Sequence, residues 1–364
     1  MRAGCPALPP VVIPCYPCHM LQPPIEPMLA KLSPSIPPGP GFLYEPKWDG
    51  FRAIIFVSAG EAYLQSRDLK PLGRYFPELE EAIPRLLAGP AVLDGEIVIM
   101  GASGLEFDTL QMRLHPAASR VKKLAAETPA SFVAFDLLAE GEDDLRSAPF
   151  GERRARLETL MAGLPPPLHI TPATHDPIVA QDWFERFEGA GFDGVIAKPV
   201  GGLYQPGVRA MAKIKHLRTA DLVVGGFRWN KEMEGTSVGS LLLGLYDAEG
   251  VFHHVGHTSS FSAQEKRDLV GFLAPYVSED SGEGFGGGRT PGAPSRWSTG
   301  KDLSWVRLRP ELVCEVTFDY LQGARIRHAA AFKRWRKDRT PASCTFDQFE
   351  AAVPMELRRV FEGG

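Results

Sequence analysis

The sequence lacks any apolar run close to the ~20 residues that a membrane-spanning helix requires, although 44% of its 364 residues are hydrophobic. Its beginning also lacks the apolar stretch of a signal peptide, because prolines interrupt residues 1–19. Cysteine is scarce, and the five cysteines are an odd number that argues against a disulfide framework. We therefore expect a cytoplasmic protein without membrane association.

The proline-rich beginning contains one pattern that invites a different interpretation. Cys15–His19 has the Cys-x-x-Cys-His spacing of covalent haem attachment, or of half a zinc site. Haem attachment requires export, which residues 1–19 do not encode, and no nearby residues complete a zinc site. We expect an irregular tail over residues 1–24 and an irregular arm as far as Pro40. Met20 is an alternative natural start.

A strong overall charge is also absent. The formal net charge is −4 with a pI near 6.2, so the whole-chain balance gives no sign of nucleic-acid binding. The distribution differs, because seven Lys and Arg residues lie between Arg325 and Arg339 against the single acid Asp338, with Phe332 and Trp335 interleaved. Such a basic block is typical of a phosphate-binding surface. It is equally typical of a solvated helix face, and the spacing does not decide between the two.

Three common catalytic motifs are missing. Thr299–Asp302 contains the Gly-Lys pair of a Walker A loop but has neither the upstream glycine nor the following Ser or Thr. The sequence contains no His-Glu-x-x-His motif and no serine-hydrolase elbow. A bound nucleotide would therefore require another architecture.

The length and the turn pattern indicate two domains. Phe51–Val57 and Ala62–Ser66 predict a hairpin, while Pro77–Leu87 and Asp182–Gly189 predict helices. Further strands are predicted at Ala91–Met100, Ser131–Leu138, Asp193–Pro199 and Ala212–His216. Beyond residue 219, short strands separated by Gly-rich turns predict a small antiparallel barrel.

The stretch Glu45-Pro-Lys-Trp-Asp-Gly-Phe-Arg52 has the clearest chemical character in the chain. A lysine attacks only as the neutral amine, which desolvation or neighbouring cations favour. Asp49 could orient the Lys47 amine or take up its proton, and Gly50 lets the backbone approach a bulky ligand. Arg52 offers a planar fork suited to phosphate. The stretch alone is equally consistent with a charged hairpin edge.

Charged residues also interrupt several apolar strands where packing alone favours apolar side chains. They are Asp94-Gly95-Glu96, Asp136, Asp193 with Lys198, and Lys213 with Lys215. If the fold gathers them around Lys47, they form one site for a polyphosphate, with lysines for phosphate oxygens and carboxylates for a divalent metal.

Taken in order, these motifs resemble those of the covalent nucleotidyltransferases, which include ATP-dependent DNA ligases, RNA ligases and mRNA capping enzymes. The likeness is greatest to the compact bacterial ATP-dependent DNA ligases of the LigC and LigD type, and it runs from about Gln22 to Asp347. The resemblance implies an α+β fold. A nucleotidyltransferase domain (ATP-grasp-like, antiparallel sheets with helices) is expected over residues 25–218, and an OB-fold barrel with the basic motif over residues 219–350.

The resemblance also implies a reaction. Lys47 would attack the α-phosphate of ATP, release pyrophosphate and hold AMP, which would pass to the 5′-phosphate of a nick and then be displaced by the 3′-hydroxyl. Asp49 and Arg336 would assist catalysis, Arg336 by orienting the pyrophosphate when the barrel domain closes. Glu96 and Asp193 would hold Mg²⁺ or Mn²⁺.

The implied nucleotide site has a base end and a phosphate end. Glu45 would contact the adenine edge, Phe135 would stack on the ring, and Glu96 would also serve the ribose. The cations implied for ribose and phosphate groups are Arg52, Arg67, Lys198, Lys213, Lys215 and Arg336.

Two motifs depart from the wider pattern. Asp193-Gly194 replaces the usual Glu-Gly and is one methylene shorter, so direct metal contact by Asp193 is in question. Arg336-Lys-Asp-Arg339 ends in arginine where lysine is common, which is not a neutral exchange at a tight phosphate site.

The resemblance predicts a monomer that seals nicked duplex DNA, with repair polymerases or end-binding proteins as partners. The alternatives are an RNA ligase, a GTP-dependent capping-type enzyme, and a catalytically idle scaffold that binds DNA ends. Intact Lys47, Asp49 and Glu96 argue against the scaffold.

Overall fold

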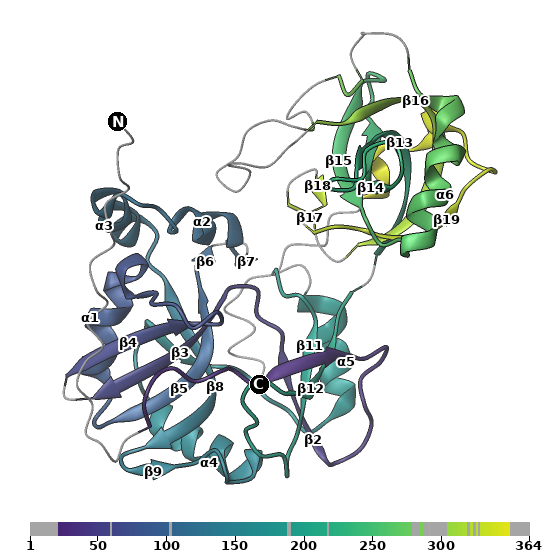
Figure 1. The fold of residues 1–364 in the computed structure, drawn as a ribbon. Coiled ribbons are helices and arrows are strands. Elements are labelled where there is room, and N and C mark those ends of the chain that lie inside the picture. The colour runs from purple at the N-terminus through teal and green to yellow at the C-terminus, as the bar shows by residue number, and fades with distance from the viewer. Residues whose placement is uncertain are drawn as a thin grey trace. The chain divides into compact units, whose positions relative to one another are not determined.

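A computed structural model describes residues 21–58, 60–101, 104–187, 191–216, 218–278, 284–286, 291, 304–318, 321–322, 325–326 and 328–349. The chain divides into two compact units (Figure 1), the first ending at Lys215 and the second beginning at His216. Within the described residues, no helix is long and apolar enough to span a membrane. The Cys15–His19 pattern and Thr299–Asp302 lie outside the described residues.

A six-stranded sheet forms the centre of the first unit. Its strand order is β10 (Leu168–Ile170), β8 (Ser131–Glu140), β5 (Ala91–Val98), β3 (Phe51–Ser58) and β4 (Glu61–Ser66), with β9 (Asp143–Asp144) paired to β8. Only the pairing of β10 with β8 is parallel in this sheet. Both faces are covered, because Ile55 belongs to one buried cluster and its neighbours Ile54 and Phe56 to another.

Five helices accompany the sheets of the first unit. They are α1 (Pro77–Leu86), α2 (Phe107–Met112), α3 (Ala118–Glu127), α4 (Phe150–Met161) and α5 (Pro177–Arg186). Helix α1 starts with a proline and buries Leu79 and Ile83, which are four residues apart and therefore share a face. Helix α4 packs against β8 and β10 and buries Leu157 and Met161 in the same core.

A second, four-stranded sheet completes the first unit. Its order is β1 (Leu29–Leu32), β12 (Arg209–Ile214), β11 (Val195–Pro199) and β2 (Phe42–Pro46), and α5 packs against β2 and β11. Strand β1 runs parallel to β12, although about 180 residues separate the two in sequence. The two-stranded β6 (Met100–Gly101) and β7 (Gly104–Leu105) lie outside both sheets.

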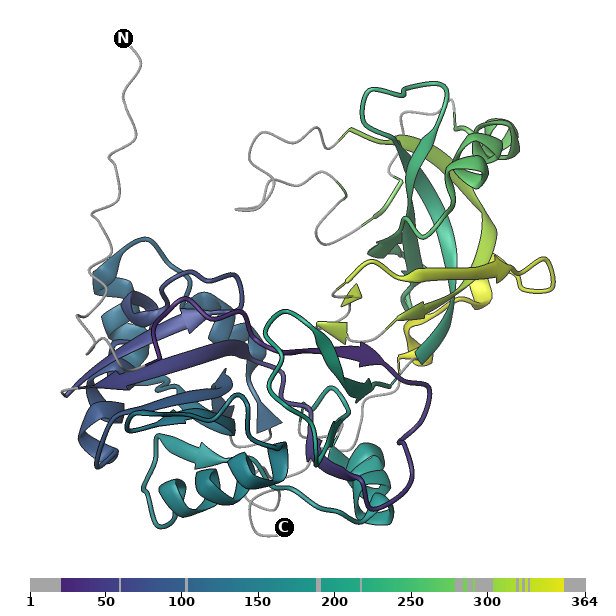
Figure 2. The same ribbon diagram turned by 60° about the horizontal axis from the view of Figure 1, so that its bottom comes forward.

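The second unit is a five-stranded antiparallel barrel. Its strand order is β15 (Phe252–Thr258), β14 (Val238–Tyr246), β13 (Arg218–Trp229), β16 (Val306–Phe318) and β19 (Ala331–Trp335). A parallel bridge between Thr258 and Ala330 joins the two edges, which gives the closed order of an OB fold. Helix α6 (Ala263–Leu273) lies alongside the barrel (Figure 2) and contacts β14. A small pair, β17 (Leu321–Gln322) and β18 (Arg325–Ile326), accompanies it.

The α+β fold class with a C-terminal OB barrel is confirmed, and so are the hairpin at residues 51–66 and helix α1. Two local predictions were wrong, and one open alternative is decided. The arm expected up to Pro40 contains β1, because β12 offers it a parallel partner. Helix α5 begins at Pro177 instead of Asp182, because the Asp176 side chain caps the helix by accepting a bond from the Ile178 N–H group. For the basic block, the alternative of a helix face is excluded at its centre, where Ala331–Trp335 forms strand β19, paired to β16.

Candidate active site

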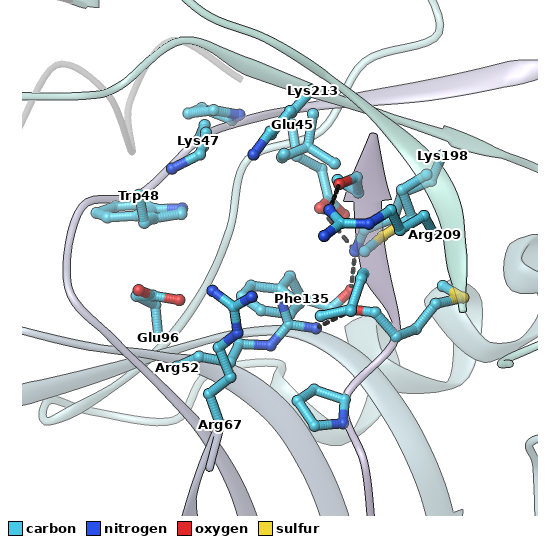
Figure 3. Close-up of a pocket in the computed structure, with 17 residues that line it drawn as sticks. Glu45, Lys47, Trp48, Arg52, Arg67, Glu96, Phe135, Lys198, Arg209 and Lys213 are labelled. Atoms are coloured by element: carbon cyan, nitrogen blue, oxygen red, sulfur yellow. Dashed lines mark hydrogen bonds and ion pairs between the residues drawn. The ribbon is translucent and has the colours of Figure 1, made fainter. Parts of the chain in front are cut away.

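A pocket lies between the two sheets of the first unit (Figure 3). The small sheet provides residues of β1, β2, β11 and β12, and the large sheet provides Arg52, Glu96 and Phe135. The sequence-predicted residues that line it are Glu45, Lys47, Arg52, Arg67, Glu96, Phe135, Lys198 and Lys213. The fold therefore brings motifs from across 170 residues of sequence into one cavity.

Lys47 follows directly after β2 and is held by backbone bonds on both sides. Its N–H group donates to the Gly194 carbonyl at 2.8 Å, and the Asp193 N–H group donates to the Lys47 carbonyl at 3.0 Å. Gly194 has a φ of +126°, and a side chain there would collide with the Ile214 carbonyl, so only glycine fits this approach. This clamp places Asp193 beside the Lys47 amine.

The Asp193 carboxylate is shared by two lysines. Its Oδ2 atom lies 2.6 Å from Lys47 Nζ and 2.8 Å from Lys215 Nζ. Lys213, on the adjacent β12, adds a third amine, whose pKa is lowered by burial and by the charges of Lys215 and Lys47. Figure 3 shows Lys47 and Lys213 directed into the same space as Arg67, which approaches from the opposite side. This concentration of positive charge suits a polyphosphate.

Glu45 lies at the opposite end of the pocket and is almost fully buried. Its carboxylate lies 2.8 Å from Lys198 Nζ and 3.4 Å from Arg154 Nη1. Burial raises the pKa of Glu45, and the charges of Lys198 and Arg154 oppose that rise. Lys198 also donates to the Phe135 carbonyl at 2.8 Å, so it connects the acid to the aromatic residue predicted to stack on the base.

Arg52 makes contacts that the sequence did not predict. Its fork binds both oxygens of Asp94 at 2.6 Å, and its guanidinium lies over the Phe135 ring, 4.4 Å from the centroid. Tyr204 donates to the same Asp94 at 2.7 Å and accepts a bond from the Met28 N–H group. Asp94 is therefore a buried partner that fixes Arg52.

Glu96 is the carboxylate best suited to a divalent metal. Burial, partly offset by Arg52 and Lys47, raises its pKa to about 7, and a cation would stabilise the charged form. No group of three potential ligands occurs among the described residues. Mg²⁺ is commonly held by one or two carboxylates together with substrate phosphates, so Glu96 fits this role. Asp193 fits less well because two ammonium groups already balance its charge.

Gly50 was expected to let the backbone approach a bulky ligand, but in the structure it lets the backbone approach a neighbouring strand. A side chain at Gly50 would collide with the carbonyl oxygen of Ile97, so the close approach is to strand β5 and not to a ligand. Asp49 lies near enough to Glu96 for its charge to help raise the pKa of that group.

In the second unit, Arg336 follows directly after β19 and is held by two acids. Its Nη1 atom donates to both oxygens of Asp221 at 2.8 and 2.9 Å, while Nε and Nη2 donate to Asp338 at 2.9 and 2.7 Å. The bonds from Arg336 lower the pKa of Asp338 to about 2. Arg339 also contacts Asp221, at 3.2 Å.

The sequence analysis missed several residues at this site. Met28, Arg209 and Met211 line the pocket, and Arg154 and Tyr204 support residues that line it. Arg209 and Met211 could have been found, because they alternate with Lys213 along one strand and therefore share its face. Met28, Arg154 and Tyr204 carry no comparable signal, since their partners are remote in sequence.

Comparisons with known proteins agree with this geometry. A family model described as "ATP dependent DNA ligase domain" matches residues 27–215, and one described as "ATP dependent DNA ligase C terminal region" matches residues 234–339. The chain is 49% identical to DNA ligase C of Mycobacterium tuberculosis, covering 94% of this chain and 98% of that protein. It is 50% identical to DNA ligase C2 of Mycolicibacterium smegmatis, covering 90% and 95%.

A solved structure of a Lig E DNA ligase is similar in fold. Its TM-score is 0.54 at 19% sequence identity, covering 85% of this chain and 99% of that one.

Proposed function

Because the chain belongs to the ATP-dependent DNA ligase family, we propose that Lys47 carries AMP during the sealing of nicks in duplex DNA. The observation that supports this most directly is the position of the Lys47 amine. It lies in the pocket wall, with Lys213 and Arg67 directed into the same space and Glu45 at the other end. A nucleotide bound with its base toward Glu45 would have its phosphates among these cations.

In the proposed first step, the neutral Lys47 amine attacks the α-phosphorus of ATP. A nitrogen–phosphorus bond forms as the bond to the bridging oxygen of pyrophosphate breaks, and the amine proton passes to a carboxylate. Asp193 Oδ2, 2.6 Å away, is placed for that transfer, and Asp49 is the acceptor that the sequence suggested. AMP then moves to the 5′-phosphate of the nick, and the 3′-hydroxyl displaces it.

We assign the rest of the pocket by charge and contact. Glu45 accepts a bond from the adenine amino group, Phe135 stacks on the base, and Lys198 orients both through its two contacts. Lys213 and Lys215 neutralise the α-phosphate, while Arg67 serves a more distal phosphate or the nick.

Arg52 binds the ribose or phosphates with the donors that Asp94 leaves available. Glu96 would hold Mg²⁺ or Mn²⁺, which would neutralise phosphate charge and assist the leaving group, and Asp193 is the weaker second ligand because two ammonium groups already balance its charge.

The barrel domain, which we propose to span residues 219–350, is assigned to DNA binding and to the pyrophosphate. Arg336 would orient the leaving pyrophosphate, and in its present contacts Asp221 and Asp338 hold the guanidinium. The exposed cations of β19 would contact DNA phosphates, which predicts salt-sensitive affinity. We also propose a monomer located in the cytoplasm.

A role in DNA repair is proposed from more distant relatives. The non-homologous end joining DNA repair protein LigD of Mycobacterium tuberculosis is 28% identical over 82% of this chain, which spans 36% of that protein. Repair polymerases or end-binding proteins are the partners this implies.

The intact mass after incubation with nucleotide and metal tests the proposal. ATP with Mg²⁺ or Mn²⁺ should add one AMP, whereas GTP should add nothing, which separates the protein from capping-type enzymes. Nicked DNA should then be sealed faster than nicked RNA. The absence of any adduct from well-folded protein would support the idle-scaffold alternative and refute the assignment of Lys47.

A further inference from the structure

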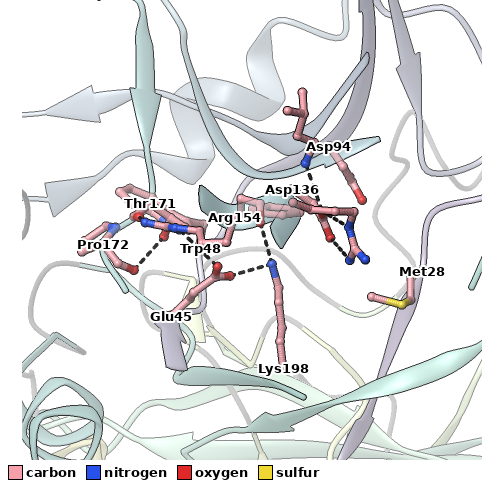
Figure 4. Close-up of polar contacts among 12 residues, drawn as sticks. Met28, Glu45, Trp48, Asp94, Asp136, Arg154, Thr171, Pro172 and Lys198 are labelled. Carbon is pink, nitrogen blue, oxygen red and sulfur yellow. Dashed lines mark hydrogen bonds and ion pairs between the residues drawn. The ribbon is translucent and has the colours of Figure 1, made fainter. Parts of the chain in front are cut away.

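A buried arginine outside all of the recognised motifs supports the base end of the pocket (Figure 4). Arg154, on α4, lies 3.4 Å from Glu45 through Nη1 and donates through Nη2 to the Thr171 carbonyl at 2.9 Å. Its Nε atom donates to Glu158 at 2.7 Å. The Arg154 side chain is only 9% exposed and that of Glu45 only 3%, so the contact between them is shielded from bulk solvent.

The same contacts connect the base end to the nucleophile segment. The Thr171 hydroxyl accepts a bond from Trp48 Nε1 at 2.8 Å, and Trp48 directly follows Lys47. Arg154 therefore contacts Glu45, which lies two residues before Lys47, and also Thr171, which binds Trp48 directly after Lys47. Contacts on both sides of Lys47 fix the position and the orientation of the segment from Glu45 to Trp48.

Glu45 is a buried acid, so its charged form depends on neighbouring cations such as Arg154. Burial raises its pKa, nearby Asp136 adds to the rise, and Lys198 and Arg154 are the two cations that lower it. Removal of Arg154 would leave one cation beside a desolvated carboxylate and would favour the protonated acid. A carboxylate only accepts hydrogen bonds, whereas a protonated acid can also donate one.

The protonation state of Glu45 therefore decides which purine it can bind. Adenine presents an amino donor at C6, whereas hypoxanthine and guanine present a carbonyl acceptor there. We propose that Arg154 is a positioning residue for base selection, which holds Glu45 as an acceptor directed at the adenine amino group and thereby excludes 6-oxopurine nucleotides. This rests on the proposed function, in which Glu45 contacts the base.

The test compares replacements of Arg154 that differ in charge. Arg154→Lys keeps a cation, whereas Arg154→Gln and Arg154→Met remove it, and two neutral variants guard against one that does not fold. The rate of covalent nucleotide transfer to the enzyme is measured with ATP and with ITP between pH 6 and pH 9. Thermal unfolding is recorded for each variant.

We expect the ATP-to-ITP ratio of kcat/KM to fall about tenfold or more in the neutral variants, because a site built around one hydrogen-bonding pattern loses its discrimination when that pattern changes. The loss should be largest at low pH, where the protonated acid prevails, and should shrink as the pH rises and Glu45 ionises. Arg154→Lys should keep the wild-type ratio within about threefold.

A matched control is Glu158→Gln, which removes only the outer, 56% exposed partner of Arg154 and should leave the ratio unchanged. Equal ratios in the Lys and neutral variants, or a pH-independent loss, would overturn the positioning role. A wild-type enzyme that forms no adduct with ATP would instead overturn the proposed function, so the two failures are distinguishable.

Discussion

The two units of this protein use ion pairs of similar length in different surroundings. In the first unit, the Arg153–Asp136 pair at 2.7 Å has side chains that are 0% and 2% exposed. In the barrel, the Arg334–Glu315 pair is also 2.7 Å long, but the arginine is 63% exposed. Distance alone therefore says little about what an ion pair contributes, since solvent screens the second pair and not the first.

The difference fits the two tasks that we propose for these units. A pocket that selects one small molecule needs charges held in place, and the first unit achieves this by burying its acids against arginines and lysines. A surface for a long polyanion needs cations that can exchange partners. In the barrel, Lys333 and Arg334 share the mostly buried Glu315 but are themselves 46% and 63% exposed, so a phosphate can reach these two cations.

The largest effect is expected from the pocket itself. Lys47→Ala should lower covalent AMP transfer by about 10³-fold or more, because it removes the nucleophile. Sealing of a nick that already carries AMP should be retained in part, since its nucleophile is the 3′-hydroxyl. Mass spectrometry and gel assays measure the two steps, and equal loss of both in folded protein would refute the role of Lys47.

The next effect tests what a buried ion pair contributes to the first unit. Arg153→Met leaves Asp136 buried without its bidentate partner and should lower the free energy of unfolding by about 3–5 kcal/mol. Denaturant unfolding followed by circular dichroism measures this change. A loss below 1 kcal/mol would mean that solvent compensates for the missing arginine, and the contrast between the units would disappear.

Arg336 tests whether the barrel also contributes to chemistry. Arg336→Ala should slow self-adenylation by about 10²-fold, as loss of one charge-stabilising donor commonly does, and should affect pre-adenylated nicks much less. If Arg336 is only a DNA contact, adenylation will be near normal and nick binding will show a shallower salt dependence. Adduct formation without DNA, together with a binding series in salt, separates these outcomes.

A smaller effect is expected on the surface of β19. Arg334→Ala should leave the unfolding midpoint within experimental error and should reduce the slope of log affinity against log salt by about 1. Glu315→Gln is the matched partner variant, which frees the cations and should not weaken DNA binding. An unchanged slope for Arg334→Ala would exclude this residue from the DNA surface.

No effect on sealing is expected from removing residues 1–19, because every recognised motif follows them. Removal of residues 1–28 should differ sharply, since Met28 lines the pocket and binds Tyr204 and Arg52. Sealing assays on the two truncations measure the contrast. A large loss on the shorter truncation, or stoichiometric haem or zinc, would contradict this expectation.

The sequence alone was sufficient for features that depend on neighbours along the chain. Phe51–Val57 with Ala62–Ser66 predicted a hairpin, and Pro77–Leu87 predicted a helix, because strand and helix patterns are local properties. The ordered motifs predicted the family and every charged residue that lines the pocket except Arg209. Phosphate chemistry requires these residue types wherever they lie in the chain.

Tertiary structure decided what depends on remote partners. Strand β1 exists because β12 offers an edge about 180 residues away, and the basic block is a strand because β16 pairs with it. Arg154 reaches Glu45 across 109 positions, and Asp193 meets the Lys47 amine through a backbone clamp. Burial strengthens these ion pairs and shifts the pKa values of their members. Burial depends on the folded chain, so no local sequence pattern predicts it.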